Sequence, residues 1–318
     1  MSKVDGSNIK FFQLRALVAV VECGSFGKAA AKLEMTQSAI SHAIAGLEDK
    51  LGVTLFARGR QGATLTPVGE AILGNVHRIL HELEAIARVT QDARGLEVGQ
   101  VRVAAIRSLA THWLPQVISA FKQRHPKIQV TVTRCVNHGE VRAMLAGGLA
   151  DVGLMDLGDT QGLTVQPIFA DDYVALLPPG SEHLPPTLTW QDLQPYALIL
   201  PVPQDDSYIK LRAYLATLPI ALPIAYEVNE DSAIVSMVAE GLGMTMLPYL
   251  AAIPIPPQVQ VRSLPQRLSR QLAAVTLDAA LHPPAVYAFL DTVEQMKSAA
   301  QPREVLRYSH DSPRDGGR

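Results

Sequence analysis

Four side chains in the stretch TQSAISH, residues 36–42, bring hydrogen-bonding groups close together. Gln37 offers an amide, Ser38 and Ser41 offer hydroxyls and His42 offers an imidazole, so the group can both donate and accept hydrogen bonds. On the outer face of a helix, such groups can pair with base edges in the major groove of DNA, and a glutamine can pair with adenine through two hydrogen bonds. A helix face that is only solvated is typically rich in Lys and Glu. The composition of this stretch therefore favours a contact with nucleic acid.

Apolar residues at helical spacing surround the polar stretch and predict three short helices between residues 14 and 51. Ser25 is placed to cap the second helix and Thr36 the third, which should end at Gly52. A short turn between the last two helices predicts a helix-turn-helix, in which the N-terminal half of the second helix enters the major groove. The polar stretch must then face outward, because the third helix buries its apolar residues Ile40, Ala43, Ile44 and Leu47.

A hairpin and a long helix are expected next. Two apolar stretches, 53–56 and 63–65, flank a glycine-containing turn in which Arg58 and Arg60 can reach phosphates or the minor groove. Thr66 and Pro67 then open a helix that should run to about residue 94. Its apolar positions follow a heptad seam, which predicts pairing between two chains, although such a seam can also pack on a single domain. The seam consists of Ile72, Val76, Ile79, Leu83 and Ile86.

From residue 99 onward, apolar stretches with strand character alternate with helical ones, which predicts parallel α/β units. Strands are expected at residues 101–105, 128–132, 152–155, 173–177, 197–200, 223–228, 244–247, 259–261 and 272–277. Helices are expected at residues 114–121, 139–145, 190–193, 207–216, 232–240 and 283–297. Residues 301–318 are polar with glycine and proline, so we expect a disordered tail.

Charge is distributed unevenly along the 318 residues, although the net charge is only −2. Residues 1–62 hold eight Lys and Arg against five Asp and Glu, whereas residues 95–318 hold seventeen against twenty-one. A basic head on an acidic body is typical of a DNA reader with a separate sensing module. No apolar run is long enough for a membrane span and the N-terminus has no apolar signal core, so we expect a cytoplasmic protein with no membrane partner.

Other function classes are not favoured by the sequence. It contains no GxSxG, Walker, HExxH or strand-linked GxGxxG motif, so we do not expect an enzyme. Cys23 and Cys135 are far apart and lack metal-ligand spacing, which predicts two reduced packing residues and neither a disulfide nor a metal site. A cytosolic solute-binding or metabolite-binding protein without a DNA-dependent role is the alternative, and the helix-turn-helix argues against it.

The stretch FFQLRALVAVVECGSFGKAAAKLEMTQSAISHAIAGLEDKLGVTLFARGRQGATLTPVGEAIL resembles the winged helix-turn-helix of LysR-type transcriptional regulators. The resemblance is specific in GSFGKAA, TQSAIS, LEDKLGVTLF and LTPVGE, and the chain has that family's layout to about residue 297. It implies a winged helix-turn-helix at 1–66, a linker and dimerisation helix at 67–98, and an effector-binding domain at 99–300. That domain would comprise two α/β subdomains similar to periplasmic binding proteins, one of residues 99–165 with 268–300 and the other of residues 166–267.

The resemblance also implies partners: double-stranded DNA, a second copy of the chain in a dimer that commonly forms a homotetramer, and RNA polymerase. A small-molecule effector would lie in the cleft between the subdomains, with no other cofactor. Peroxide sensing in this family would need a pair of reactive cysteines in the body, which holds only Cys135. Many members have proline where Ser38 stands, and His42 occupies a position where many have arginine or another polar residue. The candidate DNA contacts are Ser25, Thr36, Gln37, Ser38, Ser41, His42, Arg58 and Arg60.

A ligand in the body is expected at the carboxyl ends of the strands, where loops lead into helices. In the family, hydroxyl residues in the first such loop are typical effector contacts, and Ser108 and Thr111 fit that place. Arg107 and Arg134, with helix N-termini, would favour a small organic anion, but ion pairs on a solvated loop explain the two arginines equally well. Asp205 and Asp206 also bring negative charge near the cleft. The candidate effector contacts are Arg107, Ser108, Thr111, Arg134, Gln204, Ser207, Asn229 and Ser232.

Overall fold

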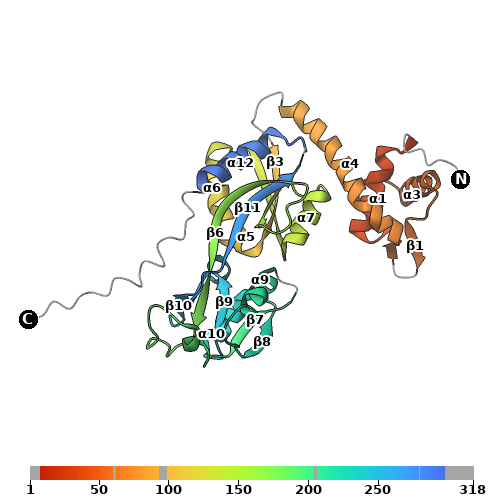
Figure 1. Ribbon diagram of the computed structural model, residues 1–318. Coiled ribbons are helices and arrows are strands. Elements are labelled where there is room, and N and C mark those ends of the chain that lie inside the picture. The colour runs from red at the N-terminus through yellow and green to blue at the C-terminus, as the bar shows by residue number, and fades with distance from the viewer. Residues whose placement is uncertain (1–7, 60–61, 93–98, 204–205, 279, 298–318) are drawn as a thin grey trace, which may run out of the picture. The chain divides into compact units, whose positions relative to one another are not determined.

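The computed structural model describes residues 8–59, 62–92, 99–203, 206–278 and 280–297 (Figure 1). Contacts divide the chain into two compact units. The first contains the N-terminal elements together with the short segments Ala143–Ala150 and His282–Pro284, and the second contains the rest of the body. The predicted disordered tail at 301–318 lies outside the described residues.

The N-terminal unit begins with three helices: α1 (Phe11–Cys23), α2 (Phe26–Lys32) and α3 (Gln37–Leu51). The predicted caps are confirmed: Lys28 N donates to Ser25 Oγ at 3.2 Å, and Ala39 N donates to Thr36 Oγ1 at 3.2 Å. Gly52 ends α3 with φ +68°, in the left-handed region that favours glycine. The side chains that form the common core include Leu17, Val20, Ile40 and Leu47, all fully buried.

The predicted hairpin forms from β1 (Phe56–Gly59) and β2 (Gly62–Leu65), which pair antiparallel. The first strand was expected at 53–56, and these bounds were wrong. The strand begins at Phe56 and includes Arg58. The reason lies in α3: the carboxylate of Glu48 accepts hydrogen bonds from Leu55 N at 2.6 Å and Phe56 N at 3.2 Å. Glu48 therefore holds the segment that enters the hairpin.

A long helix, α4 (Pro67–Asp92), follows the hairpin, and Thr66 caps it through a hydrogen bond from Gly69 N at 3.1 Å. The residues of the predicted heptad seam fall into a packed group and an exposed group. Ile72 and Val76 pack against the core of the N-terminal unit, as the single-domain alternative expected, whereas Ile79 and Leu83 are 48% and 42% exposed. The side chain of Ile86 lies outside the described residues.

The body contains a seven-stranded sheet of order β10-β6-β11-β5-β3-β4, with β9 also paired to β6. Its parallel part is β3 (Gly99–Ile106) between β4 (Ile128–Cys135) and β5 (Val152–Asp156). The long β6 (Leu163–Leu177) runs antiparallel to β11 (Ser269–Leu277), β9 (Thr245–Pro248) and β10 (Gln260–Ser263). Figure 1 shows β6 and β11 side by side, and β6 continuing from one α/β half of the body into the other.

A second, two-stranded sheet pairs β7 (Leu198–Pro201) with β8 (Ile224–Val228) in parallel. The expectation of parallel units is thus confirmed for β3, β4 and β5 and for β7 with β8, and it was wrong for β6 and β11. Only the end of β6, residues 173–177, was predicted, because Pro167 and the acidic pair Asp171 and Asp172 obscure the strand pattern. A register shift opposite Leu272 and Ala273 accommodates the irregular part.

Helices flank these sheets, and the predicted ones are present: α6 (Leu114–Arg124), α7 (His138–Ala146), α8 (Trp190–Leu193), α9 (Asp206–Leu215), α10 (Asp231–Ala239) and α12 (Pro284–Met296). Two short helices were not predicted: α5 (Arg107–His112), expected to be a loop, and α11 (Tyr249–Ala252). Both are too short to show a helical periodicity in sequence. Among the described residues, no helix combines the length and apolar character that crossing a membrane requires.

Candidate nucleic-acid interface and ligand cavity

The N-terminal half of α3 presents a polar face. Gln37, Ser38, Ser41 and His42 are exposed, whereas Ile40, Ala43, Ile44 and Leu47 are buried, which is the division that the spacing predicted. The positive end of the helix dipole and its free N–H groups lie at this same end of α3. This face can therefore hydrogen-bond to bases and can also bind phosphate.

Three of the candidate side chains are already engaged within the chain. Thr36 Oγ1 caps α3 and lies 3.0 Å from Ser38 Oγ, and the Ser25 hydroxyl caps α2. These hydroxyls fix the start of each helix, so their first role is to orient the face. Among the described residues, the side chains of Gln37, Ser41 and His42 do not cap a helix.

A hollow beside α3 joins the helix-turn-helix to the hairpin. Its lining includes the cap residue Ser25, Gly27 from α2, Gln37 and Ser41 from α3, and Ala57 from β1. The backbone of Arg58 belongs to β1, but its side chain, and all of Arg60, lie outside the described residues. The hairpin therefore borders the polar face of α3, as a wing would.

The body contains a cavity of about 70 Å³ at the carboxyl ends of β3, β4, β5, β7 and β8. Four candidate effector residues line it: Arg107, Ser108, Arg134 and Asn229. Thr111 and Ser232 are exposed and are not part of the lining. Gln204, Asp205 and the side chains of Asp206 and Ser207 lie outside the described residues.

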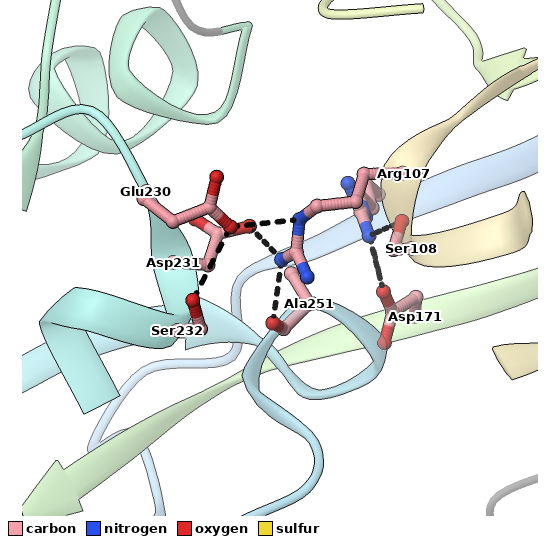
Figure 2. Close-up of polar contacts among 8 residues, drawn as sticks. Arg107, Ser108, Asp171, Glu230, Asp231, Ser232 and Ala251 are labelled. Carbon is pink, nitrogen blue, oxygen red and sulfur yellow. Dashed lines mark hydrogen bonds and ion pairs between the residues drawn. The ribbon is translucent and has the colours of Figure 1, made fainter. Parts of the chain in front are cut away.

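Arg107, the first residue of α5, is engaged by carboxylates of the other half of the body (Figure 2). Its guanidinium forms an ion pair with Asp231, lies with Nε 3.7 Å from Glu230 Oε1, and donates to the carbonyl of Ala251 at 2.9 Å. Ser232 Oγ donates to Glu230 at 3.4 Å instead of facing a ligand. The alternative interpretation of Arg107, an internal ion pair, therefore describes this structure.

A buried charge network behind Arg107 was missed by sequence reasoning. Arg270 of β11 stands directly opposite Asp171 of β6, and its Nε and Nη2 both donate to Asp171 Oδ2, at 3.0 and 2.9 Å. Arg270 Nη2 also donates to Ser108 Oγ at 2.9 Å, and Leu250 N donates to Asp171 Oδ1 at 3.1 Å. In Figure 2, dashed lines join Ser108 and Asp171 to the same nitrogen atom.

Both members of this pair are almost fully enclosed, Arg270 being 5% exposed and Asp171 0%. Burial raises the pKa of Asp171, and the positive charge of Arg270 opposes that rise. A buried ion pair persists only where further hydrogen bonds satisfy both groups, as Ser108 and Leu250 do here. The sequence signal was charge within two apolar strands: two aspartates in FADDYVALL and one arginine in SRQLAAVTL.

Cys135 lines the same cavity, but its thiol should be unreactive. Both cysteines are free thiols, as expected, and Cys135 is fully buried. Burial, helped by the negative charge of Glu140, raises the pKa of Cys135 to about 11. A thiol with that pKa is protonated at neutral pH and is a poor nucleophile.

Two family models match the chain. The model of the bacterial regulatory helix-turn-helix protein of the lysR family matches residues 11–70, and that of the LysR substrate binding domain matches residues 94–297. Among relatives, the probable HTH-type transcriptional regulator LrrA of Synechococcus elongatus is 44% identical over 89% of this chain and 96% of its own length. A probable nitrogen assimilation transcriptional activator of Synechocystis is 31% identical over 88% of this chain and 95% of its own.

Solved structures share the fold. A full-length OxyR variant from Pseudomonas aeruginosa has a TM-score of 0.70 at 23% identity and covers 90% of this chain and 98% of its own. CbnR complexed with its target DNA has a TM-score of 0.65 at 25% identity and covers 90% of this chain and 99% of its own. CbnR is a LysR family transcriptional regulator, and transcriptional regulators are not a class of enzymes. With both family models matched, the chain belongs to the LysR-type transcriptional regulators, DNA-binding proteins that carry an effector-binding domain.

Proposed function

We propose that this regulator recognises a specific DNA sequence through the N-terminal half of α3, and that a small molecule in the cavity of the body controls that binding. The observation that carries the proposal is the division of α3 into a buried apolar face and an exposed face of Gln37, Ser41 and His42. Those three side chains would meet base edges. The N-terminus of α3 with Thr36 and Ser38, the α2 cap Ser25, and the wing residues Arg58 and Arg60 would meet phosphates.

The protein would act as a dimer, with α4 pairing between two chains. Ile79 and Leu83 support this, because they continue the heptad spacing of α4 and are exposed in the single chain. Two heads would then reach successive major grooves about one helical turn apart. A homotetramer built from two dimers, a contact with RNA polymerase and a cytoplasmic location are further parts of the proposal.

The effector would lie among Arg107, Ser108, Arg134 and Asn229. The cavity lies at the carboxyl ends of parallel strands, which is where α/β sheets bind ligands. A ligand that binds one arrangement of the two halves more tightly than another shifts the equilibrium between them. Since Arg107 already joins the two halves through Asp231, a ligand beside Arg107 can change how they close.

Selection of bound sequences from random duplex DNA, repeated at two salt concentrations, tests the proposal. A sequence-specific dimer should enrich an interrupted inverted repeat at both concentrations. Binding that weakens with salt and enriches no sequence would mean phosphate attraction alone, and the proposed recognition by α3 would be wrong.

A further inference from the structure

The charges that line the cavity are balanced in sign. Three are positive, on Arg107, Arg134 and Arg270, and three are negative, on Asp156, Glu230 and Asp231. A ligand with one charge would leave the partly closed site with an unbalanced charge, which is costly. The balance therefore does not favour the small organic anion that the two arginines alone suggested.

Two of the three arginines are already neutralised within the chain. Arg107 is paired with Asp231 and has Glu230 nearby, and Arg270 is paired with Asp171 behind the cavity wall. An anion could use either guanidinium only by displacing a carboxylate of the protein. Removing one partner of a buried pair leaves an uncompensated charge, so such an exchange would be unfavourable for Arg270 above all.

One cation and one anion of the lining remain available. Within the described part of the chain, neither Arg134 nor Asp156 forms an ion pair. Asp156 is near two cations without forming an ion pair: its negative charge favours the charged form of both Lys210 of α9 and Arg270. The two charges of the lining that form no ion pair thus have opposite signs and come from different strands.

The sheet fixes the separation of these two charges. Arg134 of β4 pairs with Ala105 of β3, which pairs with Leu154 of β5, so Asp156 lies two residues beyond the position level with Arg134. Two strand spacings and two residues along the strand place the backbones of Arg134 and Asp156 about 12 Å apart. The hydroxyl of Ser108, which follows β3, accepts a hydrogen bond from Arg270, so its own proton remains free to donate.

We propose that the cavity binds a compact zwitterion, a molecule that carries both a carboxylate and an ammonium group, as an amino acid does. The carboxylate would bind Arg134 and accept from Ser108, and the ammonium would bind Asp156. This deepens the proposed function and rests on it, since it assumes that the cavity is the effector site. The ligand should be small, because about 70 Å³ is well below the volume of roughly 300 to 1,000 Å³ that ligand pockets usually have.

Binding to the full-length protein can be measured with matched probes: each proteinogenic amino acid, the carboxylic acid that lacks its amino group, and the amine that lacks its carboxyl group. Calorimetry and the shift in Tm report binding. At least one amino acid should bind about tenfold or more tightly than both its acid and its amine, since each loses one charge-assisted contact.

Two variants test the assignment of each end. Asp156→Asn should weaken binding of the amino acid about tenfold and leave binding of its matched acid nearly unchanged. Arg134→Gln should weaken binding of the amino acid and leave binding of the amine nearly unchanged. Asp291→Asn on α12 and Arg267→Gln are matched controls at exposed positions outside the lining and should bind like the parent chain. A change of preference between probes is a result that mere loss of stability cannot produce.

The inference is overturned if an acid or an amine binds as tightly as its amino acid, or if no amino acid binds. Binding assays with the selected DNA distinguish a wrong ligand class from a wrong proposed function. If an acid changes DNA binding and no amino acid does, the ligand class is wrong and the proposed function stands. If a ligand binds the cavity and leaves DNA affinity and footprint unchanged, control through the cavity is wrong, whatever the ligand class.

Discussion

Arg107 and Asp231 form an ion pair, and each is the first residue of its helix, α5 and α10 respectively. The positive charge of Arg107 is unfavourable at the N-terminus of α5, and the negative charges of Asp231 and Glu230 offset that effect. The pair also joins two segments more than one hundred residues apart on opposite sides of the cavity. Its strength should therefore affect both the stability of the body and the closure of the cavity.

A double-mutant cycle on Arg107→Gln and Asp231→Asn should give a coupling free energy of about 1 to 2 kcal/mol, because both side chains are largely buried. Urea unfolding of the full chain measures it. The same cycle on Arg267 and Asp172, an ion pair with Arg267 72% exposed, should give about 0.5 kcal/mol or less. Equal couplings would show that the Arg107 pair is no more than a surface contact.

Glu48 should matter to DNA binding although it faces no DNA in the proposed arrangement. Glu48→Ala removes the carboxylate that accepts from Leu55 N and Phe56 N, and should destabilise the entry to the wing by about 1 to 3 kcal/mol. Affinity for the selected DNA should fall as well. Asp49→Ala, next to it and exposed, is the matched control and should leave both quantities unchanged. Unchanged affinity in Glu48→Ala would mean that the wing needs no anchor.

Cys135 should resist alkylation and oxidation. In a Cys23→Ser variant, iodoacetamide should modify Cys135 at pH 8 about a hundredfold or more slowly than it does in urea, because a pKa of about 11 leaves almost no thiolate and the side chain is buried. Dilute peroxide should not change DNA binding. A rate close to that of the unfolded chain would show that the thiol is accessible and would reopen a redox role.

The wing arginines should act through phosphates. The double variant Arg58→Ala, Arg60→Ala should weaken binding on the selected DNA and on scrambled DNA alike, and should lower the slope of log affinity against log salt by about 1 to 2. Gel-shift titrations at several salt concentrations measure both effects. If the slope and the affinity stay unchanged, the wing does not contact the backbone.

The sequence predicted those parts of the protein that depend on local patterns. The caps Ser25 and Thr36, the stop at Gly52 and the outward face of α3 all follow from spacing within a few residues, and the structure bears them out. The site residues that sequence reasoning missed depend on long-range pairing. Asp171 and Arg270 are 99 positions apart and meet only because β6 and β11 pair antiparallel, a register that the strand pattern did not show.

The sequence correctly placed Arg107 at the end of a strand beside the cavity, but it did not predict the partner of that residue. Placement at the end of β3 follows from the alternation of apolar residues, whereas its pairing with Asp231 needs the fold of the whole body. An arginine near a predicted cleft therefore indicates positive charge only until the carboxylates around it are known. Here those carboxylates change the expected ligand from an anion to a zwitterion.

Base recognition by α3 can be tested with the affinity of Gln37→Ala for the selected DNA and for a scrambled duplex. Gln191→Ala, at an exposed position in α8, is the control for a lost glutamine and should bind like the parent chain. Direct recognition predicts that Gln37→Ala loses about tenfold or more on the selected DNA and little on the scrambled duplex. Equal losses on both duplexes would contradict the account, because they would mean that Gln37 contacts only the DNA backbone.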